Sequence, residues 1–211
     1  MPPQSSLKKP PLYKIVMLGD ASVGKTSLVA RLTNPRASLS LSVPATMGIE
    51  FETSVLGTSS GPVKAQLWDT AGQERFARVL LPTYFRKARG VVLVYDVTRV
   101  QTAESLRTRW ITEMHEHGAA GIRGVVVANK GDLEGAEKEE AIAAGMKLAE
   151  EMGYAFFQVS AMTGSGVREA FTRLLEDVND GEGANDAADG TDGTVELGKK
   201  KQAGSSFGCC S

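Results

Sequence analysis

A glycine-rich loop near the N-terminus has the residue types that bind phosphate. Gly19-x-x-x-x-Gly24-Lys25-Thr26 follows the apolar run YKIVML and opens into a helical pattern. Glycines let the backbone curl so that its N–H groups face inward, and the N-terminus of the following helix favours an anion. In this motif the lysine ammonium reaches the β- and γ-phosphates, and the threonine hydroxyl binds Mg²⁺. The loop predicts a nucleotide phosphate site but leaves the base open, since ATPases, kinases and GTPases all use it.

A second motif, WDTAGQERF, begins at the end of a predicted strand. Asp69 can hold the Mg²⁺ shell, Gly72 can give a backbone N–H to a terminal phosphate, and Gln73 can orient an attacking water. An Asp-x-x-Gly sequence alone is weak evidence, because loops contain many such pairs. Its place at a strand end, 44 positions after Lys25, makes it a strong prediction of the metal side of the site.

Two further motifs, NKGD and SAM, have groups that could select the base. Asp132 can accept two hydrogen bonds from N1 and N2 of guanine, a donor pair that adenine lacks. Asn129 would tie the site together, and the Lys130 stem would pack on the base face. The N–H of Ala161 is placed to meet guanine O6. Without the phosphate loop, NKGD would be a polar turn and SAM a plain strand-to-helix connection.

The elements that position these motifs alternate between apolar strands and amphipathic helices. Such alternation predicts an α/β fold with a mostly parallel six-stranded sheet and helices on both faces. Together with the phosphate loop, this predicts the phosphate-loop NTPase class. Ligands of such sheets bind beyond the carboxyl ends of the strands. The predicted strands are 13–19, 50–56, 63–69, 90–97, 124–130 and 155–160, the second and third forming a hairpin.

Helical periodicity fills the gaps between these strands. The first helix is predicted over 25–32, and Gly153 is predicted to end a later one. The apolar faces consist of Ala103, Leu106, Trp110 and Met114 in one helix, Ile142, Met146, Ala149 and Met152 in the next, and Val167, Ala170, Phe171, Leu174, Leu175 and Val178 in the last.

Composition and charge are those of an ordinary globular domain, with 42% hydrophobic residues and a net charge of -1. This charge gives no reason to expect a nucleic-acid partner. No secretory signal or membrane-spanning run is expected. We predict a flexible N-terminus over 1–11, one nucleotide-binding domain over 12–179, and a flexible, Gly- and Asp-rich tail over 180–211.

These motifs, in this order, resemble those of the Ras superfamily of small GTPases. MGIEF, WDTAGQERF, YFRKA and LVYDVT are similar to Rab sequences in particular. The resemblance implies a small G domain that binds GTP or GDP with Mg²⁺, hydrolyses GTP with Gln73, and regulates vesicle traffic. It implies that Mg²⁺ is bound by Thr26, Thr46 and Asp69. It implies that the nucleotide is bound by Ala21, Ser22, Val23, Gly24, Lys25, Thr26, Ser27, Thr46, Gly72, Asn129, Lys130, Asp132, Ser160, Ala161 and Met162.

The same resemblance implies a switch cycle with several partners. Switch I contains Thr46 and switch II spans about 71–83; both would order around GTP and be bound by effectors. An exchange factor and a GTPase-activating protein would set the rates for a monomeric chain. The ending Cys209-Cys210-Ser211 is similar to Rab endings that carry two geranylgeranyl groups. A prenyl-binding escort would carry the chain through the cytosol to the cytoplasmic face of an intracellular membrane.

Several residues depart from the family pattern. Thr46 lies 21 positions after Lys25, farther than in most members, and NPRASLSLSVPA lacks the usual aromatic residue at the guanine edge. This predicts weaker nucleotide binding or a more mobile switch I. Ala21 and Ser22 add bulk near the γ-phosphate, which could slow hydrolysis. Met162 stands in place of a lysine. A second hypothesis is therefore a membrane-anchored nucleotide-binding scaffold with little or no turnover.

Overall fold

The computed structural model describes residues 9–36, 49–70 and 81–186. Within them, six strands form one sheet in the order β2-β3-β1-β4-β5-β6. β2 and β3 form an antiparallel hairpin, and the other neighbours pair in parallel. The strands are β1 (Leu12–Leu18), β2 (Ile49–Thr58), β3 (Gly61–Thr70), β4 (Ala88–Asp96), β5 (Arg123–Asn129) and β6 (Ala155–Gln158).

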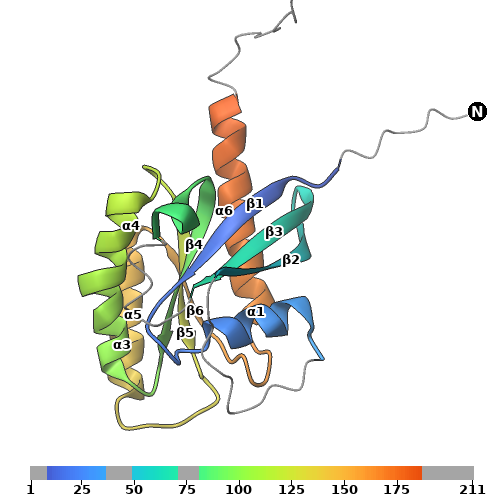
Figure 1. Ribbon diagram of the computed structural model, residues 1–211. Coiled ribbons are helices and arrows are strands. Elements are labelled where there is room, and N and C mark those ends of the chain that lie inside the picture. Colours follow the sequence, from blue (N-terminus) through green and yellow to red (C-terminus); the bar gives the residue numbers. More distant parts are fainter. Residues whose placement is uncertain (1–8, 37–48, 71–80, 187–211) are drawn as a thin grey trace, which may run out of the picture.

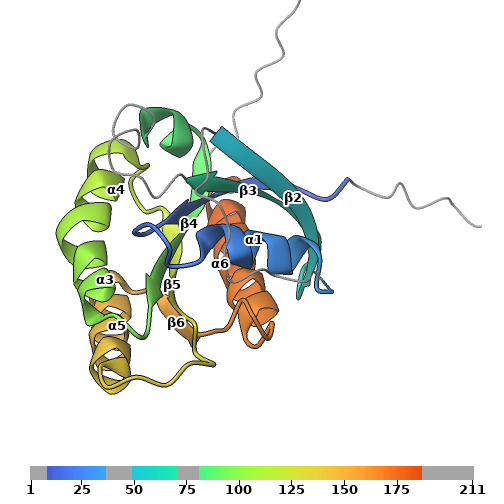
Figure 2. The same ribbon diagram turned by 60° about the horizontal axis from the view of Figure 1, so that its bottom comes forward.

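Helices cover both faces of this sheet (Figure 1). α1 and α6 pack on one face, and the α3–η1–α4 segment and α5 pack on the other (Figure 2). The predicted α/β class and the mostly parallel sheet are therefore confirmed. The helices with described bounds are α1 (Lys25–Thr33), α3 (Val100–Ser105), the π-helical turn η1 (Leu106–Trp110), α4 (Ile111–His117), α5 (Lys138–Met152) and α6 (Val167–Asp186), and residues 81–85 are helical as well.

The central strands are apolar because both of their faces are covered. β4 presents an almost unbroken buried run, as expected for a parallel strand between two helical layers. Each layer closes over its own cluster: Phe171 and Leu174 of α6 belong to one, and Leu106 and Trp110 of η1 to the other. The predicted faces of α6 and of the α3–η1–α4 segment are both buried as expected.

The predicted face of α5 is partly wrong. Met146 is 54% exposed, whereas the neighbouring Gly145 is buried. A Cβ at Gly145 would lie 2.2 Å from the Tyr95 hydroxyl oxygen, so the helix packs through its small residues. Ala149 of the predicted face is buried, and Ile142 and Met152 pack against the core, so Met146 is the misplaced member. The predicted stop at Gly153 is confirmed by its left-handed φ of 66°.

The last helix is longer than predicted. α6 continues past the expected domain boundary at 179 and ends at Asp186. Predicted strand ends differ from the observed ones by a few residues. Five predicted functional residues lie outside the described part of the chain: Thr46, Gly72, Gln73, Cys209 and Cys210. Among the described residues, none of the helices has both the length and the apolar character needed to span a bilayer.

Candidate functional site

The phosphate loop connects β1 to α1 at the carboxyl end of the sheet. Both glycines of the motif have backbone conformations that favour glycine, with φ of 142° at Gly19 and 98° at Gly24. A Cβ at Gly19 would lie 2.1 Å from the Val94 carbonyl oxygen, and one at Gly24 would lie 2.3 Å from Nδ2 of Asn129. The motif therefore has glycine at the two positions where its backbone comes close to other strands, Gly19 to β4 and Gly24 to the end of β5.

Lys25 begins α1 with its side chain turned back under the loop. Its Nζ donates to the carbonyl oxygens of Gly19 at 2.7 Å and Asp20 at 2.8 Å. The side chain is buried, and burial lowers the pKa of the ammonium to about 8. The negative charges of Asp69 and Asp20 act in the opposite direction. The loop thus holds a buried cation against two of its own carbonyl oxygens.

A hydroxyl and a carboxylate meet beside this lysine. Thr26 Oγ1 donates to Asp69 Oδ2 at 2.5 Å, bringing the start of α1 to the end of β3. Asp69 is 4% exposed. Hard oxygen donors of this kind are the ligands that Mg²⁺ uses, and Mg²⁺ takes one or two protein groups together with phosphate oxygens. The donor set of Thr26 and Asp69 therefore fits the metal that the motif implies.

Asn129 connects three of the predicted motifs. Its Nδ2 donates to the Val23 carbonyl oxygen at 2.8 Å, and its Oδ1 accepts from the Ala161 N–H at 3.1 Å. The side chain is almost fully buried, as expected for an amide whose donor and acceptor are both used. The Ala161 N–H, predicted for guanine O6, thus donates to Asn129 here. Asn129 therefore ties the phosphate loop to the loop after β6.

Lys130 has a partner that the sequence did not reveal. Its backbone is in the left-handed region, with φ of 65°, and its Nζ donates to Asp96 Oδ2 at 2.6 Å. Burial alone would raise the pKa of Asp96, but hydrogen bonds from Lys130 and Thr98 outweigh it and hold the pKa below its ordinary value. The only sequence signal was the position of Asp96, an acidic residue at the end of an apolar strand.

The remaining predicted base-side residues differ in exposure. Ser160 is buried, and its Oγ accepts the Thr163 N–H at 3.0 Å. Asp132 is exposed, and Met162 is 39% exposed. The structure therefore brings Ser160 into the protein interior and leaves the predicted base-selecting carboxylate at the surface.

Arg31 is a second residue that sequence reasoning missed. From the end of α1 its guanidinium donates to three carbonyl oxygens: Ala161 at 2.8 Å, Met162 at 2.7 Å and Pro35 at 2.7 Å. These contacts join the loop after β6 to α1 and to the start of the segment that leads to switch I. An arginine in a helix of mixed composition carries no signal for such a role in one sequence.

Fold and site together define a phosphate-loop nucleotide-binding protein. A model of the Ras family matches residues 14–180. Ras-related protein RABA2d of Arabidopsis thaliana is 36% identical over 95% of this chain and 94% of its own length. Ras-related protein RABA5a of the same plant is 40% identical over 79% of this chain and 73% of its own. Ras-related protein Rab-13 of Canis lupus familiaris is 37% identical over 79% and 80%.

The chain belongs to the Ras family and is a small GTPase of the Rab type. Membership of this group places it in membrane traffic in general terms.

Proposed function

We propose that the site binds GTP and GDP with Mg²⁺ and hydrolyses GTP slowly alone and faster with a partner. The observation that carries this proposal is the Thr26–Asp69 hydrogen bond, which joins the start of α1 to the end of β3 beside the buried Lys25 of the phosphate loop. These three groups supply the two metal ligands and the cation that phosphoryl transfer needs. The proposed nucleotide contacts are the residues predicted from the sequence, Ala21 to Ser27, Thr46, Gly72, Asn129, Lys130, Asp132 and Ser160 to Met162.

The described residues have distinct roles in this proposal. Lys25 balances the charge of the β- and γ-phosphates, while loop N–H groups hold the phosphate oxygens. Bound Mg²⁺ would neutralise charge on the phosphates, held by Thr26 and Asp69. Asn129 fixes the relative position of the phosphate and base loops, and Asp132 selects guanine. By family resemblance, Thr46 completes the metal shell, Gly72 contacts the γ-phosphate, and Gln73 orients the attacking water.

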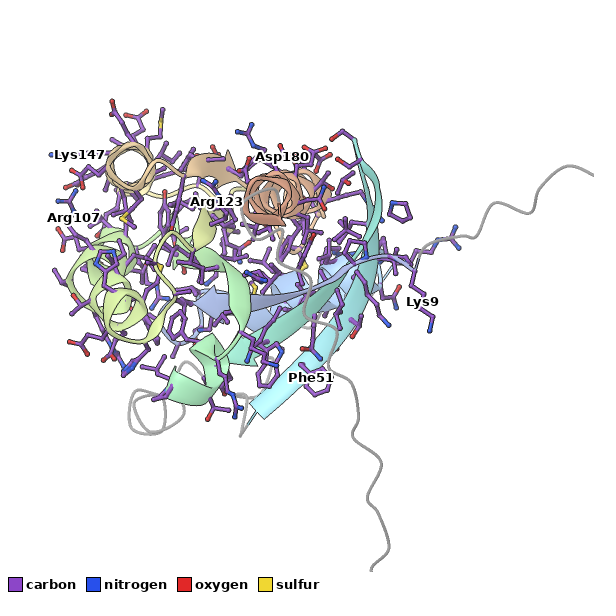
Figure 3. All side chains as sticks on the ribbon, turned by 90° about the horizontal axis from the view of Figure 1, so that it is seen from above. Lys9, Phe51, Arg107, Arg123, Lys147 and Asp180 are labelled. Atoms are coloured by element: carbon purple, nitrogen blue, oxygen red, sulfur yellow. The ribbon has the colours of Figure 1, made fainter. Side chains whose placement is uncertain are left out.

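The effector surface is proposed to include the β2–β3 hairpin. Phe51 is 54% exposed, and its ring stacks on Trp68 with a centroid distance of 5.5 Å. Trp68 also makes an edge contact with Tyr84. Figure 3 shows Phe51 on β2, on the opposite side of the sheet from α6. An exposed aromatic side chain that stacks on a second ring is a suitable contact for a partner protein. Phe51 also follows switch I closely in the sequence.

The remaining cycle follows from family membership. An exchange factor would load GTP, effectors would bind the ordered switches, and a GTPase-activating protein would supply the stimulus for hydrolysis. Two geranylgeranyl groups on Cys209 and Cys210 would anchor the chain to the cytoplasmic face of an intracellular membrane, and an escort protein would return it through the cytosol. Replacing both cysteines with serine should remove the lipid mass seen by mass spectrometry and move the protein from the membrane to the soluble fraction.

Nucleotide content and turnover test the proposal directly. Nucleotide is extracted from the purified protein and identified by chromatography, and phosphate release is then followed after loading with GTP and Mg²⁺. Bound guanine nucleotide and slow phosphate release are expected. A protein that loads neither GDP nor GTP would refute the proposal.

A Gln73→Leu variant separates the switch from the scaffold hypothesis. Stimulated hydrolysis should fall strongly in this variant while GTP binding remains, because the residue would orient water and not bind the nucleotide. If the unchanged protein binds GTP but releases no phosphate even with activating protein, and Gln73→Leu changes nothing, the scaffold hypothesis is favoured. The unusual switch I motivates that second candidate.

A further inference from the structure

The phosphate loop is attached through one carboxylate oxygen to the α3–η1 segment, which packs over β4. Asp20 Oδ1 accepts hydrogen bonds from Ser105 Oγ at 2.8 Å and from Trp110 Nε1 at 2.9 Å. The two donors lie 85 and 90 positions farther along the chain. Trp110 is fully buried and Asp20 is half-buried, so these bonds are partly shielded from water. None of the three residues belongs to the nucleotide contacts predicted from the sequence.

A π-helical turn explains how both donors reach the same oxygen. Ser105 and Trp110 are five residues apart, and in an α-helix, at 100° per residue, their side chains would point about 140° away from each other. Here the segment between them is η1, and the Ile111 N–H donates to the Leu106 carbonyl oxygen, five residues back. The wider turn brings residues five apart to similar sides of the helix. Such turns occur often at functional sites, and this one faces the phosphate loop.

A carboxylate is a costly choice in a loop that must hold anions. Its negative charge opposes that of bound phosphate, so an amide or a carbonyl would serve Trp110 with less repulsion. The side chain of Asp20 is directed to the helix, whereas its backbone oxygen accepts from Lys25 Nζ at 2.8 Å. One residue therefore contacts the phosphate-binding cation through its main chain and the helix through its side chain.

We propose that Asp20, Ser105 and Trp110 form an anchor that positions the phosphate loop and Lys25 for the nucleotide phosphates. The anchor rests on the proposed nucleotide site, which it deepens by naming residues that set how long the nucleotide stays bound. All three are positioning residues, because they act through the loop and through Lys25. The charge of Asp20 strengthens both hydrogen bonds, as expected when the acceptor is ionised.

Dissociation of a fluorescent GDP analogue from the full-length protein tests the anchor. Ser105→Ala and Trp110→Phe each remove one donor, and Phe keeps a ring on which Arg109 can stack as it does on Trp110. Each should release GDP about three to ten times faster than the unchanged protein, given the worth of a hydrogen bond to a charged group. Because both donors share one oxygen, the double variant leaves the charge of Asp20 without either bond and should release GDP faster than each single variant.

Two controls separate positioning from general loss of stability. Ser105→Thr keeps the hydroxyl and should restore slow release, which a change in packing alone would not predict. Tyr154→Phe removes another side-chain hydrogen bond, from the Tyr154 hydroxyl to the Ile122 carbonyl oxygen at 2.8 Å, near the start of β5. It should leave the release rate unchanged even if the melting temperature falls.

The outcomes distinguish the anchor from the function on which it rests. An unchanged protein that retains no guanine nucleotide overturns both. If the unchanged protein holds GDP, but Ser105→Ala and Trp110→Phe release it at the same rate, the anchor alone is overturned. An equal increase in the GDP release rate of Tyr154→Phe would also overturn the anchor. A spectroscopic signature supports it independently: in a Trp68→Phe background, Trp110 is the remaining tryptophan, and its fluorescence should change when GDP is released.

Discussion

The two ends of the candidate site are built differently. At the phosphate end, Lys25 and Asp69 are buried and are held by hydrogen bonds within the protein. At the base end, Asp132 is exposed, and its loop is held in position by other residues closer to the protein interior. Those supporting groups are the buried Asn129 and the paired side chains of Asp96 and Lys130.

This difference indicates how the two tasks are divided. Triphosphate binding needs charge, and charge acts most strongly where water is excluded, so its groups are buried and organised in advance. Base selection needs hydrogen-bond acceptors in the correct place, and an exposed carboxylate on a rigid frame can provide them. Changes at the phosphate end should therefore alter affinity most, and changes in the frame should alter stability as well.

The largest effect is expected from Lys25→Ala. GTP affinity should fall about 100-fold, because a charge-assisted contact to the phosphates is lost. The unfolding free energy of the nucleotide-free protein should stay constant or rise, since burial of the ammonium is unfavourable, as the lowering of its pKa to about 8 shows. Competition titration and urea unfolding measure the two quantities. A parallel loss of both would mean that Lys25 is mainly structural.

Asp96→Asn tests the frame behind the base end. The change weakens the bond to Lys130 and should cost about 2 kcal/mol of unfolding free energy near neutral pH. The folded pKa of Asp96 lies below its ordinary value of 3.8. Its contribution is therefore fully present above the unfolded pKa and is lost as the pH falls through the folded one.

Urea unfolding of the unchanged protein and Asp96→Asn across pH 7 to 2 measures this contribution. The gap between them should be constant from neutral pH down to about pH 4 and then shrink. Arg173 and Asp177 form an exposed pair on α6, and Asp177→Asn is a matched control that should show almost no gap. A gap for Asp96→Asn that persists at pH 2 would show that its charge is not the cause.

The sequence predicted the residues of the motifs better than the residues that support them. Gly19, Gly24 and Lys25 are recognisable because their types and spacing are dictated by the chemistry of phosphate binding. The parallel sheet was predictable for a similar reason, since continuous apolar runs that alternate with amphipathic helices have few other solutions. Both predictions depend on local patterns.

Supporting contacts could not be predicted because they join residues far apart in the chain. Asp20 was within the phosphate motif, but nothing local connects it to Trp110, which looked like an ordinary core residue. Arg31 resembles any surface arginine until the loop after β6 is placed beside it. The contact face of α5 was predicted correctly at Ile142, Ala149 and Met152 but not at Met146. The contact of Gly145 with Tyr95 was missed because it depends on small size, which a hydrophobicity pattern does not record.

Asp132→Ala should affect selectivity and leave stability unchanged. GTP affinity should fall about tenfold or more, because the acceptor for the N1 and N2 groups of guanine is lost. The unfolding free energy should change by less than about 0.5 kcal/mol, since the side chain is exposed. Inosine triphosphate lacks the 2-amino group and is the matched ligand: its affinity should fall less than that of GTP. Equal losses for the two would place guanine selection on another residue.

The smallest effect is expected from Ser22→Gly at the phosphate end. Ser22 has φ of 63°, a left-handed conformation that costs a residue with a Cβ about 1 kcal/mol. Glycine removes this strain but adds freedom to the unfolded chain, so we expect a gain of about 0.5 kcal/mol in unfolding free energy. Lys87→Gly is a matched control, because Lys87 is exposed and has φ of 61° outside the phosphate loop.

Both glycine variants should therefore gain similar stability in thermal unfolding. Only Ser22→Gly should also hydrolyse bound GTP faster, because it removes bulk near the expected γ-phosphate position. If the hydrolysis rate of Ser22→Gly equals that of Lys87→Gly and of the unchanged protein, the Ser22 side chain does not limit the reaction. Ala21 and the unusual switch I would then be the remaining candidates for a slow rate.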